Sequence, residues 1–348
     1  MTFVHAGHGA TMLFMLLLLL GAGAVGAAVL SRRVIGLRIL DYPTGRSAHA
    51  RPVPKGGGLA ILVVFVTGVP LAQMIWHHTP TLADKTLLAA TAWLGLFSWR
   101  DDMHPMPALW KLGAQVLAAL LVAWGSLGIL PHDGTAWGML LGRSLWLVVL
   151  CNVLNFMDGL DGLAAGCTLL ACVVTAILCL HAGAGVDTWG TALVMAVAIA
   201  GFLPFNFPNA RLFMGDVGSQ CCGLVLGALG LHMANLPPLA HGWALMPLML
   251  SGLLADVGVT LLRRTMLRRP LLQAHREHIY QMAHRGGMQP ATITVLAWAA
   301  TLCGAGAACA LAGGVIGLPA AAGGVLALQL AWAVVVIRRV RHTPGLRW

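Results

Sequence analysis

Charged residues are scarce in this sequence. Only 9% of its 348 residues are Asp, Glu, Lys or Arg, whereas 59% are hydrophobic and the mean hydropathy is +0.84. A soluble domain carries about 25% charged residues, so the composition excludes one. No polar stretch is long enough for a separate globular domain, and apolar runs of about 20 residues, enough to cross a bilayer, recur throughout. We therefore expect residues 1–348 to form one all-α, polytopic membrane domain.

Two further absences narrow the class of protein. The eight cysteines include no CxxC pair and fall mostly within apolar runs. They predict small buried side chains rather than a disulfide framework or a zinc site. The first residues, MTFVHAGHG, carry no Lys or Arg, unlike the start of a signal peptide. The apolar run at 12–30 is therefore expected to be a retained span.

Hydropathy predicts about eleven spans. They lie near residues 11–30, 57–76, 83–99, 107–129, 138–156, 162–181, 187–205, 218–236, 242–262, 290–312 and 315–337. Lys and Arg gather in 31–58, 263–287 and 338–348, which the positive-inside rule assigns to the cytoplasm. The C-terminus is then cytoplasmic and, with an odd number of spans, the N-terminus is external. The net charge of +10 reflects this topology, and no nucleic-acid partner is expected.

The few acidic residues also divide by side. Asp84, Asp133 and Asp187 fall in outer loops and are expected to be solvated. Asp256 lies within a span. The other acids lie in or next to inner loops: Asp41, Asp101, Asp102, Asp158, Asp161, Asp216 and Glu277. Acids have little influence on topology, so their gathering on one face has another cause.

The segment NVLNFMDGLDGLAAG, residues 152–166, carries two asparagines and two aspartates in an otherwise apolar part of the sequence. On a helix, Asn152, Asn155 and Asp158 fall within about 120° of one another, so they can face one interior. Mg²⁺ binds carboxylate oxygens together with substrate phosphates and water, and the arginines of nearby inner loops match phosphate. The inner face therefore predicts a site for a divalent cation and a polyanionic substrate.

Each cluster also has a structural interpretation. Asp216, in MGDVGS, would favour a helix N-terminus, and Asp101 with Asp102 would suit a solvated helix end. The glycines at 56–58 would turn the chain or admit a neighbouring helix. A zinc site at His275 and His278 lacks an obvious third ligand. None of these interpretations explains why all the clusters lie on one side.

Five motifs together resemble the polyprenyl-phosphate N-acetylhexosamine-1-phosphate transferases. They are RSAHARPVPKGGG, DD at 101–102, NVLNFMDGLDGLAAG, FNFPNARLFMGDVGS and HREHIYQ. The family includes the phospho-N-acetylmuramoyl-pentapeptide transferases and the initiators of O-antigen, enterobacterial common antigen and teichoic acid synthesis. The resemblance runs from Asp41 to about Gln281.

The resemblance implies an enzyme of the bacterial inner membrane whose active site is built from cytoplasmic loops. A polyprenyl phosphate, such as undecaprenyl phosphate, attacks the β-phosphorus of a UDP-N-acetylaminosugar, and UMP leaves. The reaction requires Mg²⁺, with Mn²⁺ as a substitute. This chemistry would account for paired acids at the membrane face.

The resemblance also implies roles for individual residues. Asp216 is expected to bind Mg²⁺. Asp101, with Asp102 beside it, is expected to position or deprotonate the lipid phosphate. Asp158 and Asn155 are expected to line the reaction centre.

The remaining implied residues concern the donor. Asp161, Asn206 and Phe213 are expected to form the nucleotide pocket, with Phe213 stacking on uracil. The residues expected to reach the phosphates or the sugar are Lys55, His275, Arg276 and His278.

One departure bears on the branch of the family. Many relatives carry a His-rich tract where HIYQ places Tyr280 and Gln281. This favours an O-antigen-type initiator and leaves the phospho-N-acetylmuramoyl-pentapeptide transferase as the alternative. The donor could carry GlcNAc, GalNAc or a 6-deoxy sugar.

Two rival functions are weaker. An ion-coupled transporter would spread its acids through the membrane depth, whereas here Asp256 alone is deep. A CDP-alcohol phosphotransferase would carry its aspartates in one compact motif. The sequence leaves the oligomeric state open, including a homodimer.

Overall fold

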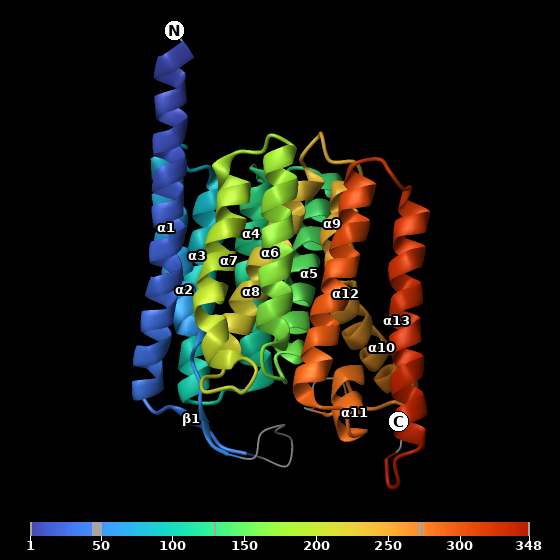
Figure 1. The fold of residues 1–348 in the computed structure, drawn as a ribbon. Helices are drawn as coiled ribbons and strands as arrows, with labels where there is room; N and C mark the ends of the chain where they lie inside the picture. Colours follow the sequence, from blue (N-terminus) through green and yellow to red (C-terminus); the bar gives the residue numbers. More distant parts are fainter. Residues whose placement is uncertain (1, 44–50, 129, 271–272, 274, 347–348) are drawn as a thin grey trace.

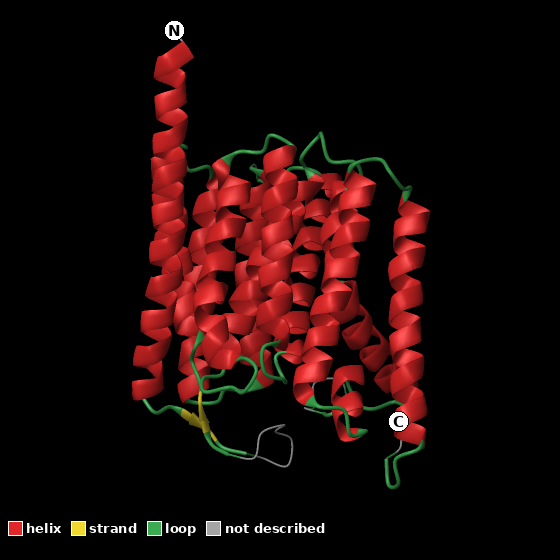
Figure 2. Cartoon of the chain, viewed as in Figure 1, coloured by secondary structure: helices red, strands yellow, loops and turns green. Residues whose placement is uncertain are grey.

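The computed structural model describes residues 2–43, 51–128, 130–270, 273 and 275–346, and in this part of the chain the fold is a bundle of helices (Figures 1 and 2). The helices are α1 (Thr2–Gly36), α2 (Gly58–Ile75), α3 (Leu82–Met103), α4 (Ala108–Leu127), α5 (Gly134–Met157), α6 (Leu163–His181), α7 (Val186–Asn206), α8 (Gly215–Ala234), α9 (Gly242–Met249), α10 (Ser251–Met266), α11 (Ile279–Arg285), α12 (Pro290–Ala312) and α13 (Leu318–Arg341). A two-residue antiparallel pair, β1 (Leu40–Asp41) and β2 (Val53–Pro54), lies beyond the bundle. The all-α, polytopic prediction is confirmed.

Ten of the eleven predicted spans each coincide with one helix, but not every helix is long and apolar enough to cross a membrane. Among the described residues, nine helices are long and apolar enough to cross a membrane. The predicted span 242–262 is instead a pair, α9 and α10, bent by 75°, which would make a tenth. The apolar run continues through this break, so hydropathy gives no sign of it. Helix α3 is long enough at 22 residues, but it carries charged residues at both ends and falls outside the nine.

Helix α8 forms the centre of the bundle. In the apolar 18-residue stretch of α8, 83% of the residues are buried. The corresponding values for α1 and α13, at the periphery, are 6% and 17%. Small residues let neighbouring backbones approach closely. A Cβ on Gly223 would lie 2.5 Å from the carbonyl oxygen of Leu150 in α5, so glycine is required for this contact. Because α8 is central, its N-terminus, which carries Asp216, lies among the ends of the surrounding helices.

The two ends of the bundle differ. The pair β1–β2 and helix α11 lie at the end where α13 finishes, and the N-terminal end of α1 lies at the other (Figure 1). This places the two ends of the described chain on opposite sides of the bundle, as an odd number of spans predicts. We call the end with β1 and α11 the cavity end, because the site described below lies there.

The acids at the opposite end are only partly as predicted. Asp133 is exposed and caps the start of α5, where it accepts a 2.7 Å hydrogen bond from the Ala136 N–H. Asp84, however, is only 4% exposed. It forms a reciprocal cap with Thr81, whose backbone N–H donates to Asp84 Oδ2 over 2.7 Å. The prediction of a solvated Asp84 is wrong, because this carboxylate closes the first turn of α3.

Candidate active site

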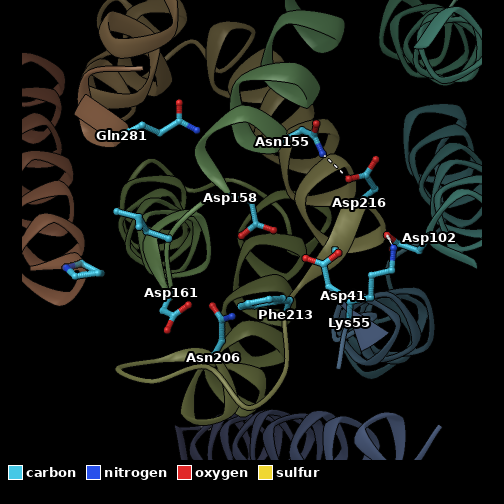
Figure 3. Close-up of a pocket in the computed structure, with 14 residues that line it drawn as sticks. Asp41, Lys55, Asp102, Asn155, Asp158, Asp161, Asn206, Phe213, Asp216 and Gln281 are labelled. Atoms are coloured by element: carbon cyan, nitrogen blue, oxygen red, sulfur yellow. Dashed lines mark hydrogen bonds and ion pairs between the residues drawn. The ribbon is translucent and has the colours of Figure 1, made fainter. Parts of the chain in front are cut away.

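One cavity at the cavity end brings together residues from five segments of the chain (Figure 3). It has a volume of about 370 Å³. The lining residues are Asp41, Lys55, Asp102, Asn155, Asp158, Gly159, Leu160, Asp161, Asn206, Phe213, Gly215, Asp216, Gln281 and Pro290. Eight of the twelve residues that the sequence predicts for the site are among them. The motif RSAHARPVPKGGG reaches it only through its last residues, and residues 46–50 lie outside the described part of the chain.

The glycine triplet at 56–58 places the preceding loop against α8. The Phe213 N–H donates to the Pro54 carbonyl over 2.8 Å, and the Gly57 N–H donates to the Phe213 carbonyl over 2.9 Å. A Cβ on Gly58 would lie 2.0 Å from the Gly218 backbone nitrogen. Both structural interpretations of these glycines are therefore observed: Gly56 turns the chain with a φ of 103°, and Gly58 admits the neighbouring helix.

This backbone pairing fixes Lys55 at the cavity wall. The backbones of Lys55 and Phe213 form an isolated parallel β-bridge. The side chain of Lys55 places its Nζ 3.6 Å from Asp102 Oδ1. Figure 3 shows this pair on one side of the cavity, with the ring of Phe213 below Asp158. A cation, a carboxylate and a flat aromatic ring thus line one wall.

The turn between α5 and α6 carries Asp158 and Asp161. It is tied to the loop after α7 by Asn206, whose Oδ1 accepts from the Gly162 N–H over 2.9 Å and whose Nδ2 donates to the Leu212 carbonyl over 3.0 Å. Asp161 Oδ2 accepts from the Ala210 N–H over 2.9 Å. Asn206 and Asp161 therefore line the cavity and also hold its shape, while their role in binding a nucleotide stays a prediction.

Asp216 lies in the first turn of α8 and is surrounded by donors. Asn155 Nδ2 donates to Oδ1 over 2.9 Å. Lys111 Nζ and Gln220 Nε2 donate to Oδ2 over 3.2 and 3.3 Å. The convergence of Asn155 and Asp216 was predicted, whereas Lys111 and Gln220 were missed. A lone lysine inside an apolar span is functional by default, so Lys111 could have been found from the sequence.

The neighbouring residues Asp101 and Asp102 face different surroundings. Asp101 is buried, pairs with Lys111 and accepts a 2.7 Å hydrogen bond from the Met106 N–H. It is absent from the cavity lining. Asp102 lines the cavity, so the structure brings the second residue of the pair, and not the first, to the site.

Negative charge accumulates in this cavity. Burial, and then the charges of Asp216, Asp102 and Asp161, raise the pKa of Asp158 well above its usual range. Burial and the charge of Asp216 raise the pKa of Asp102 to about 7, against the lowering effects of Lys55 and of nearby backbone N–H groups. Asp102 Oδ2 is buried and has no hydrogen-bond partner of good geometry among the described residues. Such carboxylates favour the binding of a cation.

The donor set suits a hard divalent ion that is completed by a substrate. Within the described residues no three His, Cys, Asp or Glu side chains form a metal cage. Mg²⁺ usually takes only one or two carboxylates and completes its shell with phosphates and water. Asp102 Oδ2, which is buried without a well-aligned donor in the described part of the chain, and the crowded Asp158 therefore fit such an ion beside Asp216.

The three predicted residues of the HREHIYQ motif lie away from this cavity. His278 is 3% exposed and its Nδ1 lies 3.1 Å from Asp256 Oδ1. Its ring stacks on His275 at 4.9 Å. His275 and Arg276 line a second cavity of about 350 Å³ that shares no lining residue with the first. Their proposed contacts with diphosphate or sugar stay predictions.

Instead, Gln281 of the same motif lines the main cavity, opposite Asp216 in Figure 3. Its Nε2 donates to the Tyr280 hydroxyl over 3.1 Å, and that hydroxyl donates to the Phe156 carbonyl over 2.9 Å. Asp41 lines the cavity as well. Gln281 and Asp41 were not predicted as site residues. The sequence contains only indirect signs of them: the departure from the family pattern at HIYQ and the inner-loop position of Asp41.

Comparison with known proteins gives consistent matches. Residues 85–234 match glycosyl transferase family 4. The chain is 35% identical over 221 residues to the decaprenyl-phosphate N-acetylglucosaminephosphotransferase of Mycolicibacterium smegmatis, over 56% of this chain and 54% of that protein. It is 28% identical over 264 residues to the probable undecaprenyl-phosphate N-acetylglucosaminyl 1-phosphate transferase of Bacillus subtilis, over 72% and 71%.

A third relative is covered more completely. The phospho-N-acetylmuramoyl-pentapeptide-transferase of Moorella thermoacetica is 31% identical over 282 residues, which are 74% of this chain and 84% of that protein. By contrast, the chain spans about half the length of the mycobacterial relatives it matches. The matched region contains the segments that carry Asp102, Asp158 and Asp216.

Proposed function

The chain belongs to glycosyl transferase family 4, and on that premise we propose that it transfers an N-acetylaminosugar 1-phosphate from a UDP-sugar to a polyprenyl phosphate, such as undecaprenyl phosphate. An oxygen of the lipid phosphate bonds to the β-phosphorus of the donor. The bond from that phosphorus to the bridging oxygen breaks, and UMP leaves with its electron pair. The product, a polyprenyl diphosphate-sugar, would begin the synthesis of an envelope polysaccharide of the O-antigen type.

One observation carries the proposal: a single cavity at one end of a membrane bundle combines five aspartates with Lys55 and Phe213. A cavity at this position can receive a lipid phosphate from the bilayer and a soluble nucleotide from the adjoining water. Lys55 would contact the phosphates, and Phe213 offers a face for uracil. The carboxylates would repel a diphosphate unless a divalent cation lay between them.

We assign that cation as Mg²⁺, with Mn²⁺ as a substitute. Asp216 would hold it together with Asp102 or Asp158 and the substrate phosphates. When bound, the ion would neutralise phosphate charge and stabilise the charge that develops during transfer. Asn155 and Lys111 would orient Asp216 through their hydrogen bonds to it.

Of the adjacent aspartates, Asp102 is the better candidate to contact the lipid phosphate. Asp101 already pairs with Lys111 and accepts the Met106 N–H. Asp102 lies in the cavity wall beside Lys55. A proton released by the lipid phosphate would pass to the Asp102 carboxylate.

The chain is a multi-pass membrane protein, and we propose that its cavity end faces the cytoplasm of a bacterium, at the inner membrane. The basic segments 31–58, 263–287 and 338–348 support this orientation by the positive-inside rule. A reporter fused after residue 348 would then be active only if it works in the cytoplasm. Whether the enzyme acts as a homodimer stays a separate prediction.

The back-reaction tests the proposed function. The transfer exchanges one phosphoanhydride for another, so the purified protein should form UDP-sugar from polyprenyl diphosphate-sugar when UMP and Mg²⁺ are added. EDTA should abolish the exchange, and AMP should support it poorly. A transporter would give no exchange, and a response to CMP alone would overturn the uridine-donor assignment.

The forward reaction then distinguishes the two branches of the family. UDP-GlcNAc, UDP-GalNAc, a UDP-6-deoxy-N-acetylaminosugar and UDP-N-acetylmuramoyl-pentapeptide are offered with undecaprenyl phosphate. Transfer from one of the first three, and not from the pentapeptide donor, is the expected result. Transfer from the pentapeptide donor alone would assign the protein to the peptidoglycan branch.

A further inference from the structure

Behind Asp216, three side-chain amides form a chain of hydrogen bonds that crosses from α5 through α4 to α8. Asn152 Nδ2 donates to Gln115 Oε1 over 2.8 Å. Gln115 Nε2 donates to Gln220 Oε1 over 3.3 Å, and Gln220 Nε2 donates to Asp216 Oδ2 over 3.3 Å. None of the three amides lines the cavity.

All three hydrogen bonds run in the same sense. Gln115 and Gln220 each accept from the amide before them and donate to the group after them, and Asn152 donates at the start, so the NH₂ groups point towards the Asp216 carboxylate. Hydrogen bonds aligned in this way polarise one another, and the effect is stronger in a buried environment of low dielectric constant. Gln115 and Gln220 are each only 3% exposed.

With this row of hydrogen bonds, both Asn152 and Asn155 are connected to the Asp216 carboxylate. Asn155 donates directly to Asp216 Oδ1, and Asn152 reaches Asp216 Oδ2 through Gln115 and Gln220. Gln115 also lies one helical turn after Lys111, so both face the same carboxylate from α4. The donors to the Asp216 carboxylate described above therefore lie on helices: Asn155 on α5, Lys111 on α4 and Gln220 on α8.

We propose that Gln220, supported by Gln115 and Asn152, is a positioning residue that fixes the Asp216 carboxylate for the divalent cation. This inference rests on the proposed role of Asp216 as a metal ligand. Groups that orient a metal ligand typically change metal affinity about 10- to 100-fold when they are removed. The competing interpretation is that the amides only join three helices, which would affect stability and leave cation binding unchanged.

The chain offers a matched control in Gln73 of α2. Gln73 is 2% exposed, and neither its Nε2 nor its Oε1 has a hydrogen-bond partner among the described residues. The substitution Gln→Met keeps the length of the side chain and removes its polar groups. Gln73→Met therefore makes the same chemical change at an equally buried position outside the chain of amides.

The experiment measures cation binding and stability side by side. The purified full-length protein, with UDP present, is titrated with Mn²⁺ by electron paramagnetic resonance, and thermal unfolding is recorded for each variant. For Gln220→Met we expect the Mn²⁺ dissociation constant to rise about 10-fold. A smaller rise is expected for Gln115→Met, and none for Gln73→Met. The Gln115→Met/Gln220→Met double variant should match Gln220→Met, because the chain acts through its last member.

Asp216→Asn is the reference for the outcome. If it raises the Mn²⁺ dissociation constant while Gln220→Met and Gln115→Met do not, the inference is overturned and the proposed metal ligand stands. If Asp216→Asn leaves Mn²⁺ binding unchanged, the metal assignment fails and the inference fails with it. Should Gln220→Met not fold, Gln115→Met decides, because it leaves the direct contact to Asp216 in place: an unchanged dissociation constant overturns the inference.

Discussion

The acids at the two ends of the bundle are used in different ways. At the opposite end, Asp84 closes the first turn of α3 and Asp133 caps α5. Their hydrogen-bond partners lie at most six residues away in the sequence. At the cavity end, Asp102, Asp158 and Asp216 come from three separate segments and share one cavity. A local cap lowers the free energy of the folded chain, whereas a cluster of like charges raises it.

The difference teaches which carboxylates are structural and which are functional. The repulsion at the cavity end is visible in the raised pKa of Asp158, whose causes after burial are the three neighbouring aspartates. Folding alone gives no reason to gather these charges. A ligand that carries positive charge into the cavity would relieve them, which is the role proposed for the divalent cation.

The largest expected effect is on the most crowded carboxylate. Asp158→Asn should lower UMP-dependent exchange by at least about 100-fold, because it removes a charged group from the proposed reaction centre. The unfolding temperature should not fall, because the substitution replaces a carboxyl whose ionised form is disfavoured by burial and by the neighbouring aspartates. A variant that keeps near-normal exchange, or that loses stability as a cap variant does, would contradict the functional assignment.

A second effect concerns the backbone that carries Asp158. A Cβ on Gly159 would lie 2.1 Å from the Tyr280 hydroxyl oxygen but 3.1 Å from the ring carbon that bears it. Gly159→Ala should therefore displace the turn and reduce exchange about 10-fold or more, in line with the sensitivity of catalysis to misplaced groups.

Tyr280→Phe provides the test of that explanation. Alone it loses the hydrogen bond to the Phe156 carbonyl, at a cost of about 1 kcal/mol in stability. Combined with Gly159→Ala it relieves the clash, so the double variant should be more active than Gly159→Ala. Additive losses in the exchange assay would show that the hydroxyl contact does not set the turn.

The sequence predicts more of the site than of its supports. The gathering of acids and asparagines at the inner loops predicts the site, and the resemblance to the transferase family identifies Asp102, Asn155, Asp158 and Asp216 within it. The supports come from tertiary packing. Gln115 and Gln220 are isolated glutamines in apolar helices, and nothing in their spacing indicates that α4 and α8 bring them together.

The fold shows the same division. Hydropathy locates the helices, since a span needs a long apolar run whatever its neighbours are. The 75° bend between α9 and α10 has no such signal, because apolar residues continue through it. The contact of His278 with Asp256 joins the start of α11 to α10, so the motif HREHIYQ could be recognised without placing its two histidines.

At the opposite end, effects should fall on stability alone. Asp84→Ala removes the carboxylate that accepts from the Thr81 backbone N–H and hydroxyl, whereas the Thr81 hydroxyl can still accept from the N–H of residue 84. We expect it to lower the free energy of unfolding by about 1–2 kcal/mol. UMP exchange per folded molecule should be unchanged. Loss of exchange at full stability would break the comparison between the two ends.

The smallest effect is expected at Asp133, which caps a helix as Asp84 does but is exposed to water. Its carboxylate accepts the Ala136 N–H, but it is exposed, so water can replace it when it is removed. Asp133→Ala should lower the free energy of unfolding by only about 0.5–1 kcal/mol. Asp133→Ser should restore most of that loss, because a serine hydroxyl also accepts at this position. Thermal unfolding of the three proteins should show stability decreasing in the order Asp133, Asp133→Ser, Asp133→Ala. Exchange activity should be equal in all three. An alanine variant that lost exchange would mean that an acid at this end also serves the reaction, and local capping would then no longer separate the two ends.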